Sequence, residues 1–416
     1  MPSRNNEITP LLSSDGPSSP HDFTSDSDYR TDPDVPPSSS TPTSQAPRDT
    51  LYHVLITILV LSSFTAGVVL AVKSGGLRRG RFTGEYVLQS YQTSENMLDD
   101  YEFYIGKDSA GSGGYVTYVS KSDGFDLNII GTSPSGSLYL GSSLLNSSRT
   151  SIRLEGRTRY SNGLFLLKLE HAPTGCGVWP AWWLTDEGNW PEDGEIDIFE
   201  SVNKQSKAKT ALHTTEGCEM KDAPRGEFTG EWDTAVGIPD KKTGVPKETG
   251  KLATNCYVYD PDQWLNQGCV VESDTEGTIG TGFNDAGGGM YALEWDPGYG
   301  RIRTWAWKEE DIPTEVLDSY NGGEDVNTDD WGLPYGHFPI GEDSDCEASH
   351  FRNMRVVFNM AFCGTVAGNR FGLDCPKEKE KYGTCEKYVS EDENVEEAYW
   401  LIEGMRVWQR KFVEHN

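Results

Sequence analysis

Three carboxylic acids stand close together in residues 194–200, which read Gly-Glu-Ile-Asp-Ile-Phe-Glu. Acidic and apolar residues alternate from Glu195 to Ile198, the pattern of a β-strand with one buried face. Glu195 and Asp197 are therefore expected on one face, and the isoleucines in the core. At strict alternation Glu200 would point the other way, but one extra residue near Ile198 or Phe199, a β-bulge, would return it to the acidic face.

Carboxyl groups on one strand face can cleave a glycosidic bond. Cleavage with retention of the anomeric configuration needs two carboxyl groups about 5 to 5.5 Å apart. One attacks the anomeric carbon and the other protonates the leaving oxygen. Negative charge on Glu195 and Asp197 would disfavour ionisation of Glu200, which would then keep its proton until it is needed. The alternative interpretation is a solvated strand face without chemistry.

Four tryptophans, in residues 178–190, directly precede the acidic strand. Their flat indole faces stack well on the apolar faces of pyranose rings, so they favour a carbohydrate site. We expect Trp179, Trp182 and Trp190 to contact substrate. Core packing remains the alternative for any single one, because neighbours on a strand, such as Trp182 and Trp183, point to opposite sides.

Short alternating runs, separated by clusters of Gly, Asn and Asp, follow from about residue 83. Strands are predicted in 114–120, 137–141, 151–155, 164–170, 291–295, 354–358 and 406–408. No long amphipathic helix and no repeat is evident, so we predict an all-β, antiparallel β-sandwich or jelly roll. Residues 216–289, rich in Gly, Lys, Thr and Asp, are predicted to form long loops at its edge.

The net charge and the cysteines of the chain limit the binding partners and the cellular compartment that we expect. The formal charge of −29 excludes a nucleic-acid partner and suits a neutral polysaccharide, or simply a soluble acidic protein. The eight cysteines all follow residue 175 and form no CxxC pair, which disfavours zinc and predicts disulfides formed in a secretory lumen. Only Cys256 and Cys269, which bracket a turn-like loop, are predicted as a particular pair.

The sequence resembles glycoside hydrolase family 16, specifically its fungal laminarinase-like endo-1,3(4)-β-glucanases. The resemblance covers nearly all of residues 83–412 and rests on segments 113–120, 178–183, 194–200, 211–215, 291–295, 356–364 and 397–400. It implies that Glu195 is the nucleophile, Glu200 the acid/base and Asp197 an assisting carboxylate. It also implies a concanavalin-like jelly roll, and a groove-lining His213 that orients Asp197 or binds sugar.

The function implied is endo-hydrolysis of β-1,3- or mixed β-1,3/1,4-glucan with retention of configuration. A cell-wall glucan transglycosylase would use the same residues, with a second glucan in place of water. A non-catalytic glucan-binding relative is the alternative from another class, although it would lack one or both glutamates. No cofactor or catalytic metal is expected. Family members hold calcium away from the groove, but no ligand spacing locates it here, and the oligomeric state is not predicted.

The chain before the predicted sandwich looks like a membrane anchor. Residues 1–50 are predicted to be a disordered cytoplasmic tail with a sorting-like motif at 7–12, 51–72 a transmembrane signal-anchor helix, and 73–82 a juxtamembrane linker. Basic residues at 73–81 favour the opposite orientation. The cysteines and the Asn146 sequon outweigh them and predict a type II protein with a lumenal or extracellular domain, on a vacuolar route or at the plasma membrane. Cleavage after Arg79 would release the domain, unless the basic run is a plain charge cluster.

Overall fold

A computed structural model describes residues 85–411, apart from 109–110, 146–147, 238–246 and 324–325. The predicted tail, transmembrane segment and linker therefore lie outside the described residues, as do Asn146 of the sequon and the two ends of the predicted sandwich, residues 83–84 and 412. Among the residues that are described, no helix is long and apolar enough to cross a membrane.

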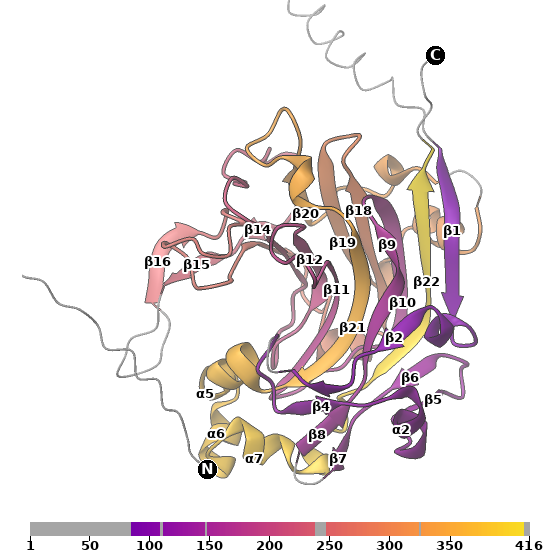
Figure 1. The fold of residues 1–416 in the computed structure, drawn as a ribbon, viewed down its shortest axis with the longest axis vertical. Helices are drawn as coiled ribbons and strands as arrows, with labels where there is room; N and C mark the ends of the chain where they lie inside the picture. Colours follow the sequence, from indigo (N-terminus) through magenta and orange to yellow (C-terminus); the bar gives the residue numbers. More distant parts are fainter. Residues whose placement is uncertain (1–84, 109–110, 146–147, 238–246, 324–325, 412–416) are drawn as a thin grey trace, which may run out of the picture. The chain divides into compact units, whose positions relative to one another are not determined.

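Two antiparallel eight-stranded sheets pack face to face, as predicted (Figure 1). The first runs β20 (Gly336–Pro339), β19 (Arg301–Lys308), β18 (Gly289–Asp296), β10 (Gly163–His171), β22 (Trp400–Arg410), β6 (Leu138–Leu140) and β5 (Ile130–Thr132), with β1 (Tyr86–Thr93) also paired to β22. The second runs β14 (Glu231–Trp232), β17 (Cys269–Glu272), β13 (Lys209–His213), β12 (Glu195–Glu200), β11 (Val178–Thr185), β21 (Met354–Phe362), β9 (Arg153–Tyr160) and β2 (Tyr101–Phe103).

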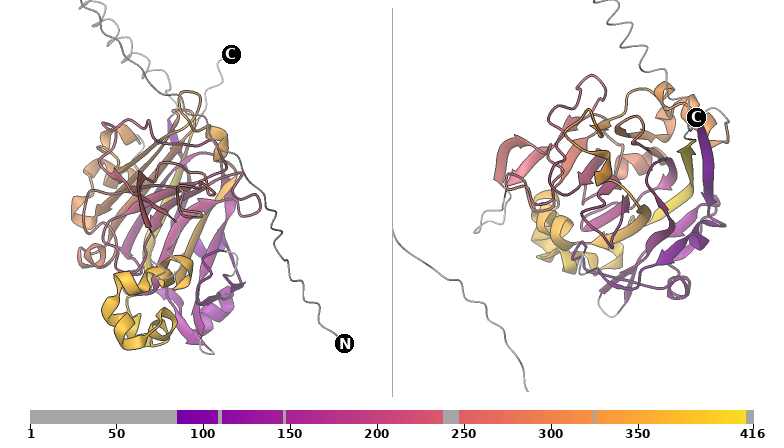
Figure 2. Two further views of the ribbon diagram at one scale, coloured as in Figure 1. Left: turned by 90° about the vertical axis from the view of Figure 1, so that its left-hand side faces the viewer. Right: turned by 45° about the horizontal axis from the view of Figure 1, so that its top comes forward.

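The core between the sheets is built from one face of each strand. Trp182 and Leu184 of β11 and Ile196 of β12 are fully buried there with Phe165 and Leu167 of β10. Period-two alternation produces this layer, because every second side chain of a strand points to the same side. The second sheet is curved, and its other face lies on the concave side of the curve (Figures 1 and 2).

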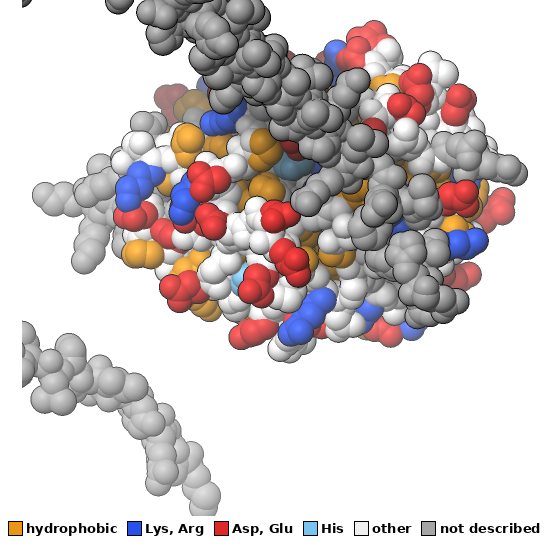
Figure 3. All heavy atoms as spheres, turned by 90° about the horizontal axis from the view of Figure 1, so that it is seen from above, with side chains coloured by type: hydrophobic (Ala, Val, Ile, Leu, Met, Phe, Trp, Pro, Cys, Tyr) orange, Lys and Arg blue, Asp and Glu red, His pale blue; other side chains and the backbone are white. Residues whose placement is uncertain are grey.

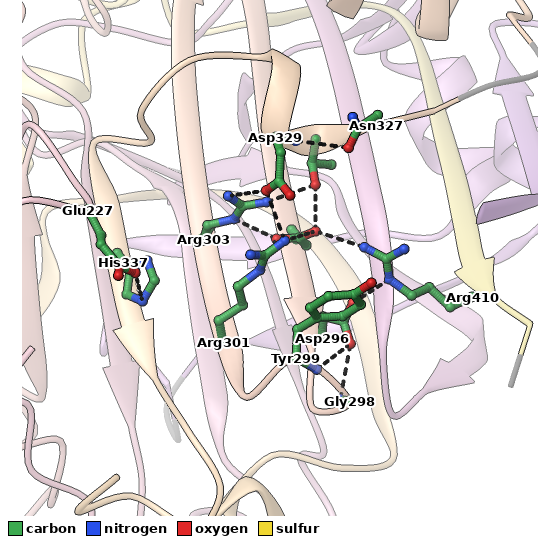
Figure 4. A network of polar contacts seen from close by, with 12 residues as sticks. Glu227, Asp296, Gly298, Tyr299, Arg301, Arg303, Asn327, Asp329, His337 and Arg410 are labelled. Carbon is green, nitrogen blue, oxygen red and sulfur yellow. Dashed lines mark hydrogen bonds and ion pairs between the residues drawn. The ribbon is translucent and has the colours of Figure 1, made fainter. Parts of the chain in front are cut away.

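The outer face of the first sheet is closed by a buried ionic network (Figure 4). Glu294 is 0% exposed and accepts hydrogen bonds from Arg303 Nε at 2.6 Å, Arg301 Nε at 3.0 Å and Thr328 Oγ1 at 2.7 Å. Burial alone would raise the pKa of Glu294, but the charges of Arg303 and Arg301 outweigh it and lower that pKa to about 2. This network ties Thr328 and Asp329 to the outer face of the first sheet.

Shorter elements surround the sandwich. One small sheet contains β3 (Gly106–Lys107), β4 (Val116–Tyr118), β8 (Ser148–Ser151) and β7 (Ser143–Leu145), and a separate hairpin contains β15 (Thr234–Gly237) and β16 (Lys247–Leu252). The helices are α2 (Lys121–Asp126), α3 (Thr281–Asp285), α4 (Thr314–Tyr320), α5 (Asn369–Asp374), α6 (Pro376–Tyr382) and α7 (Cys385–Val389), together with single turns at Met97–Asp99, Glu309–Asp311, Thr328–Asp330, Ala348–His350, Gly364–Gly368 and Asp392–Asn394.

The prediction of long loops over 216–289 is wrong in part. Strands β14 to β17 lie within it, and β17 pairs with β13 in the concave sheet, from Lys209↔Glu272 to Leu212↔Cys269. Pairing with a distant strand, rather than local composition, makes this segment a strand.

Two walls flank the concave sheet, and two disulfides hold each of them. The upper wall comprises residues 214–230, 253–268 and 341–350, and the lower wall comprises residues 364–395 (Figures 1 and 2). The upper wall is cross-linked by Cys218–Cys346 and Cys256–Cys269, and the lower wall by Cys363–Cys385 and Cys176–Cys375. The predicted Cys256–Cys269 pair is confirmed. A disulfide stabilises such irregular segments mainly by restricting the unfolded chain.

Candidate active site

Strand β12 carries the predicted bulge, next to β11. Trp183 pairs with Asp197 and Trp182 with Phe199, so Ile198 is the extra residue. The register also places Thr185 opposite Glu195 and Ala181 opposite Glu200. Directly paired residues share a face, and 181, 183 and 185 alternate onto one side of β11. The bulge therefore brings all three carboxyl groups to the concave face, while Ile196, Ile198 and Phe199 are 0% exposed in the core.

Each of the two glutamates lies beside a tryptophan. The Trp179 indole Nε1 donates a hydrogen bond to Glu200 Oε1 at 2.7 Å. At the other end of the strand, the Trp190 indole N–H lies close enough to favour the charged form of Glu195, although it completes no hydrogen bond of good geometry. A donor facing each carboxyl group limits the positions that the side chain can take.

His213 lies beside the other two acids. Strand β13 pairs Glu195 with His213 and Asp197 with Ala211. The imidazole Nε2 lies 3.0 Å from Asp197 Oδ2 and 3.9 Å from Glu195 Oε1. His213 and Asp197 are each 6% exposed, so this contact is largely shielded from water. The geometry places His213 where the sequence predicted a residue that orients Asp197.

The surroundings of the site favour the protonated forms of its carboxylic acids. Burial, followed by the charge of Asp197, raises the pKa of Glu195 to about 8. Burial and the charge of Glu200 raise the pKa of Asp197 well above its ordinary range. Neighbouring carboxyl groups in a poorly hydrated place do not all ionise readily, so at least one of them holds a proton at neutral pH.

The same three groups are also a potential ligand set. One oxygen or nitrogen atom each from Glu195, Asp197 and His213 lie within 4.8 Å of one another, a spacing that a divalent cation could bridge. The other cluster of this kind among the described residues is Cys176, Cys375 and Glu378, whose sulfur atoms are joined in a disulfide and cannot ligate a metal as thiolates.

The prediction that Trp182 contacts substrate is wrong. Its side chain is 0% exposed and stacks on Phe358 inside the core, with ring centroids 6.1 Å apart. Trp183, which the prediction left out, lies instead on the concave face. Its Nε1 donates to Asn359 Oδ1 at 2.7 Å, and the Arg153 guanidinium lies 5.4 Å from its ring centroid. The pairing of position 183 with Asp197 is the signal that identifies it, and only the register gives that pairing.

A hollow of about 460 Å³ adjoins the site on the upper wall. Its lining includes Glu192, two residues after Trp190, and Thr215, two residues after His213. It also includes His350, whose ring nitrogens lie 3.2 Å from Thr215 Oγ1 and 3.2 Å from Gly217 O. Acidic side chains spread over the surface seen from this end, with hydrophobic ones between them (Figure 3). The hollow is lined by polar and charged side chains.

A sandwich of antiparallel sheets with carboxyl groups on a bulged strand of its concave face is the architecture of a jelly-roll glycoside hydrolase. A model of the XgeA-like catalytic domain of glycoside hydrolase family 16 matches residues 101–408. The chain belongs to glycoside hydrolase family 16.

Individual relatives are similar over the same region. A protein of Arthroderma benhamiae named endo-1,3(4)-beta-glucanase is 36% identical over 334 residues, and the match covers 78% of this chain but 65% of that protein. A solved structure of laminarinase 16A from Phanerochaete chrysosporium, with β-glucans in both donor and acceptor sites, is 30% identical with a TM-score of 0.65, covering 78% of this chain and 99% of that one. An elongating family 16 β-1,3-glucosyltransferase is also 30% identical, with a TM-score of 0.62, covering 78% and 100%.

Proposed function

We propose that this protein is a retaining endo-β-glucanase that cleaves β-1,3- or mixed β-1,3/1,4-glucan. The observation that carries the proposal is the bulge at Ile198, which turns Glu195, Asp197 and Glu200 to the same concave face. An open concave face suits internal cleavage of a long chain, because the substrate can lie across it without threading an end. The printed names of the relatives support glucan as the substrate class.

In the first step, the Glu195 carboxylate attacks the anomeric carbon. The bond from that carbon to the leaving glucan oxygen breaks, and Glu200 gives its proton to that oxygen. In the second step, Glu200 takes a proton from water as the water oxygen attacks the same carbon, and the ester bond to Glu195 breaks. Two inversions give net retention, and Glu200 ends with its proton restored.

Glu195 must be ionised to attack, although its pKa is raised to about 8. After burial, the charge of Asp197 is the second cause of that rise. A proton on Asp197 would remove this second contribution and so lower the pKa of Glu195. In this assignment Oδ2 of Asp197 accepts from His213 Nε2, and Oδ1 carries the proton towards Glu195. Asp197 then acts as a neutral donor beside the nucleophile. No metal or other cofactor is needed for these steps.

Tryptophans would hold the sugar ring. Trp179 lies beside Glu200 and Trp190 beside Glu195. Trp183, which donates a hydrogen bond to Asn359, presents its ring on the concave face. Trp183 takes the place that was expected of Trp182.

Transglycosylation is the second candidate. The relative described as an elongating β-1,3-glucosyltransferase is as similar to this chain as the laminarinase is. A sugar hydroxyl would replace water in the second step, and the catalytic carboxyl groups would be unchanged. Products longer than the laminari-oligosaccharide supplied would identify transfer.

The test is product analysis of the purified protein on β-1,3-, mixed β-1,3/1,4- and β-1,4-glucans, with proton NMR of the first products. We expect short oligosaccharides from the first two, appearing initially as the β-anomer. Initial α-anomer would refute retention. Binding without cleavage, by a folded wild-type protein, would favour the glucan-binding alternative instead.

The location stays a proposal as well. We infer a type II membrane protein anchored by residues 51–72, with residues from 83 onwards in the lumen or outside the cell, and with release after Arg79 as an option. The disulfides of both walls support an oxidising compartment. Protease protection of the sandwich in intact microsomes would test the orientation.

A further inference from the structure

Gly268, in the upper wall, leaves no room for a side chain beside His213. Its φ is +68°, and a Cβ added there would lie 2.8 Å from His213 Nδ1 and 2.9 Å from Cε1, and would also collide with the carbonyl oxygen of Leu212. Carbon atoms in packed interiors approach one another to about 3.5–4.0 Å. Only glycine therefore allows the backbone at position 268 to lie against the imidazole while the ring faces Asp197.

The surroundings of the imidazole differ between its two nitrogens. On one side, Nε2 lies 3.0 Å from Asp197 Oδ2. On the other, Nδ1 is buried, and none of the described residues offers it a hydrogen-bond partner. Of the two neutral tautomers, the one with hydrogen on Nε2 pairs that hydrogen with Asp197 and leaves Nδ1 as a bare acceptor against Gly268. The other tautomer would bury an unpaired N–H.

The loop that contains Gly268 is held from several directions. The Cys256–Cys269 disulfide closes it, and Cys269 pairs with Leu212 at the start of β17. Inside the loop, Gln263 Nε2 donates to Gly268 O at 2.9 Å and to Asn255 O at 2.7 Å. Gln263 is only 5% exposed, so these bonds are shielded. The backbone at Gly268 is thereby fixed relative to β13, which carries His213.

We infer that the loop closed by Cys256–Cys269 is a positioning element for the site, and that Gly268 is the positioning residue that sets the orientation and tautomer of His213. This inference rests on the proposed function. The backbone of Gly268 blocks the rotation that would take Nε2 away from Asp197. Nε2–H then marks Oδ2 of Asp197 as the acceptor and leaves Oδ1 to carry the proton towards Glu195.

The variant Gly268→Ala tests this. The matched control is Gly287→Ala, at φ +84° on an exposed turn before β18 in the other sheet, where a Cβ would meet nothing within 4 Å. Both variants place alanine at a positive φ, but only the first collides with the Leu212 carbonyl oxygen and with His213. At a temperature well below both melting points, we expect kcat on laminarin to fall at least tenfold for Gly268→Ala, with KM nearly unchanged, and less than twofold for Gly287→Ala.

A double-mutant cycle separates positioning from loss of fold. In a His213→Ala background, Gly268→Ala should reduce kcat less than twofold further, while its effect on Tm persists. Equal losses of kcat in both backgrounds would overturn the inference, as would wild-type kcat in Gly268→Ala with a lowered Tm. Should that variant not fold, Gln263→Ala frees the Gly268 carbonyl without a clash. It should lower kcat several-fold in the wild-type background and not in His213→Ala, and equal effects would again refute the inference.

Failure of the inference and failure of the proposed function give different results. If wild-type protein cleaves no glucan, the proposed function fails before any variant is compared. If wild-type protein cleaves glucan and the cycle shows no coupling between Gly268 and His213, the function stands and the positioning role falls. The ¹⁵N signals of His213 give a readout independent of turnover, because the inference requires hydrogen on Nε2 and none on Nδ1 in the wild-type protein.

Discussion

Replacing Glu195 with Gln should stabilise the folded protein increasingly as the pH rises from 4.5 to about 8. Burial and the charge of Asp197 raise the pKa of Glu195 from 4.5 to about 8 on folding. The native state therefore binds this proton more tightly than the unfolded chain does. Its stabilising contribution is complete below pH 4.5 and is lost as the pH rises through the folded pKa. Gln does not titrate, so the variant escapes that loss.

The magnitude follows from the two pKa values. At pH 7 the unfolded carboxyl group is about 2.5 pH units above its pKa, which corresponds to about 3 kcal/mol at ~1.36 kcal/mol per unit. This is an upper value, because 15% of the Glu195 side chain is exposed to water on the concave face and because a proton on Asp197 would remove the second cause of the rise. An unfolding entropy of about 2 cal/mol/K per residue, over roughly 330 residues, converts it into a Tm increase of up to about 5 °C.

The assay is calorimetric or fluorescence-detected melting of wild type and Glu195→Gln between pH 4.5 and 8.5. Glu380→Gln, on an exposed part of α6, controls for the change in net charge. The Tm difference should be near zero at pH 4.5 and grow steadily with pH. A difference that is constant with pH, or that is largest at acidic pH, would refute the assignment of a raised pKa to Glu195.

Substitutions at three further positions probe the proposed chemistry. Glu200→Ala should lower kcat on glucan by about 10²–10⁴-fold, and azide should restore turnover of an activated aryl glycoside as the β-glycosyl azide; an α-azide product would argue against Glu200 as the acid/base. Asp197→Asn should keep more activity than Asp197→Ala, because its amide can donate towards Glu195 and accept from His213; the reverse order in kcat would mean that Asp197 must be charged. Trp179→Phe removes the 2.7 Å bond to Glu200, so kcat should fall about tenfold with a small change in KM, and a rise in KM alone would assign Trp179 to substrate binding only.

The strand that carries the acids was predictable because its signal is local. Alternation predicts the buried Ile196 and Ile198, and three acids on one strand require a bulge to share a face, which the register shift at Ile198 confirms. The Cys256–Cys269 disulfide was also within reach, because its partners are 13 residues apart. The pairs separated by 199 and 128 residues depend on how the walls fold back on the sheet.

The tryptophans show where sequence patterns lose their force. Trp182 and Trp183 are adjacent, so either could face the core. Because odd and even positions of this strand both carry tryptophan, alternation does not show which of the two is buried. The phase is fixed by the pairing of β11 with β12 across the bulge. The contact between Gly268 and His213 is equally hidden, because a positive-φ glycine 55 positions away has no local relation to the strand it supports.

Covalent trapping of the glycosyl-enzyme would identify the nucleophile. The protein would be incubated with an activated 2-deoxy-2-fluoro-laminaribioside, which slows hydrolysis of the glycosyl ester, and the labelled peptide would be sequenced by mass spectrometry. A single adduct is expected on Glu195, absent from Glu195→Gln. An adduct on Asp197 or Glu200 would contradict the assignment of Glu195 as the nucleophile. Complete hydrolysis of the substrate by the wild-type protein, with inversion and without an adduct, would contradict it as well.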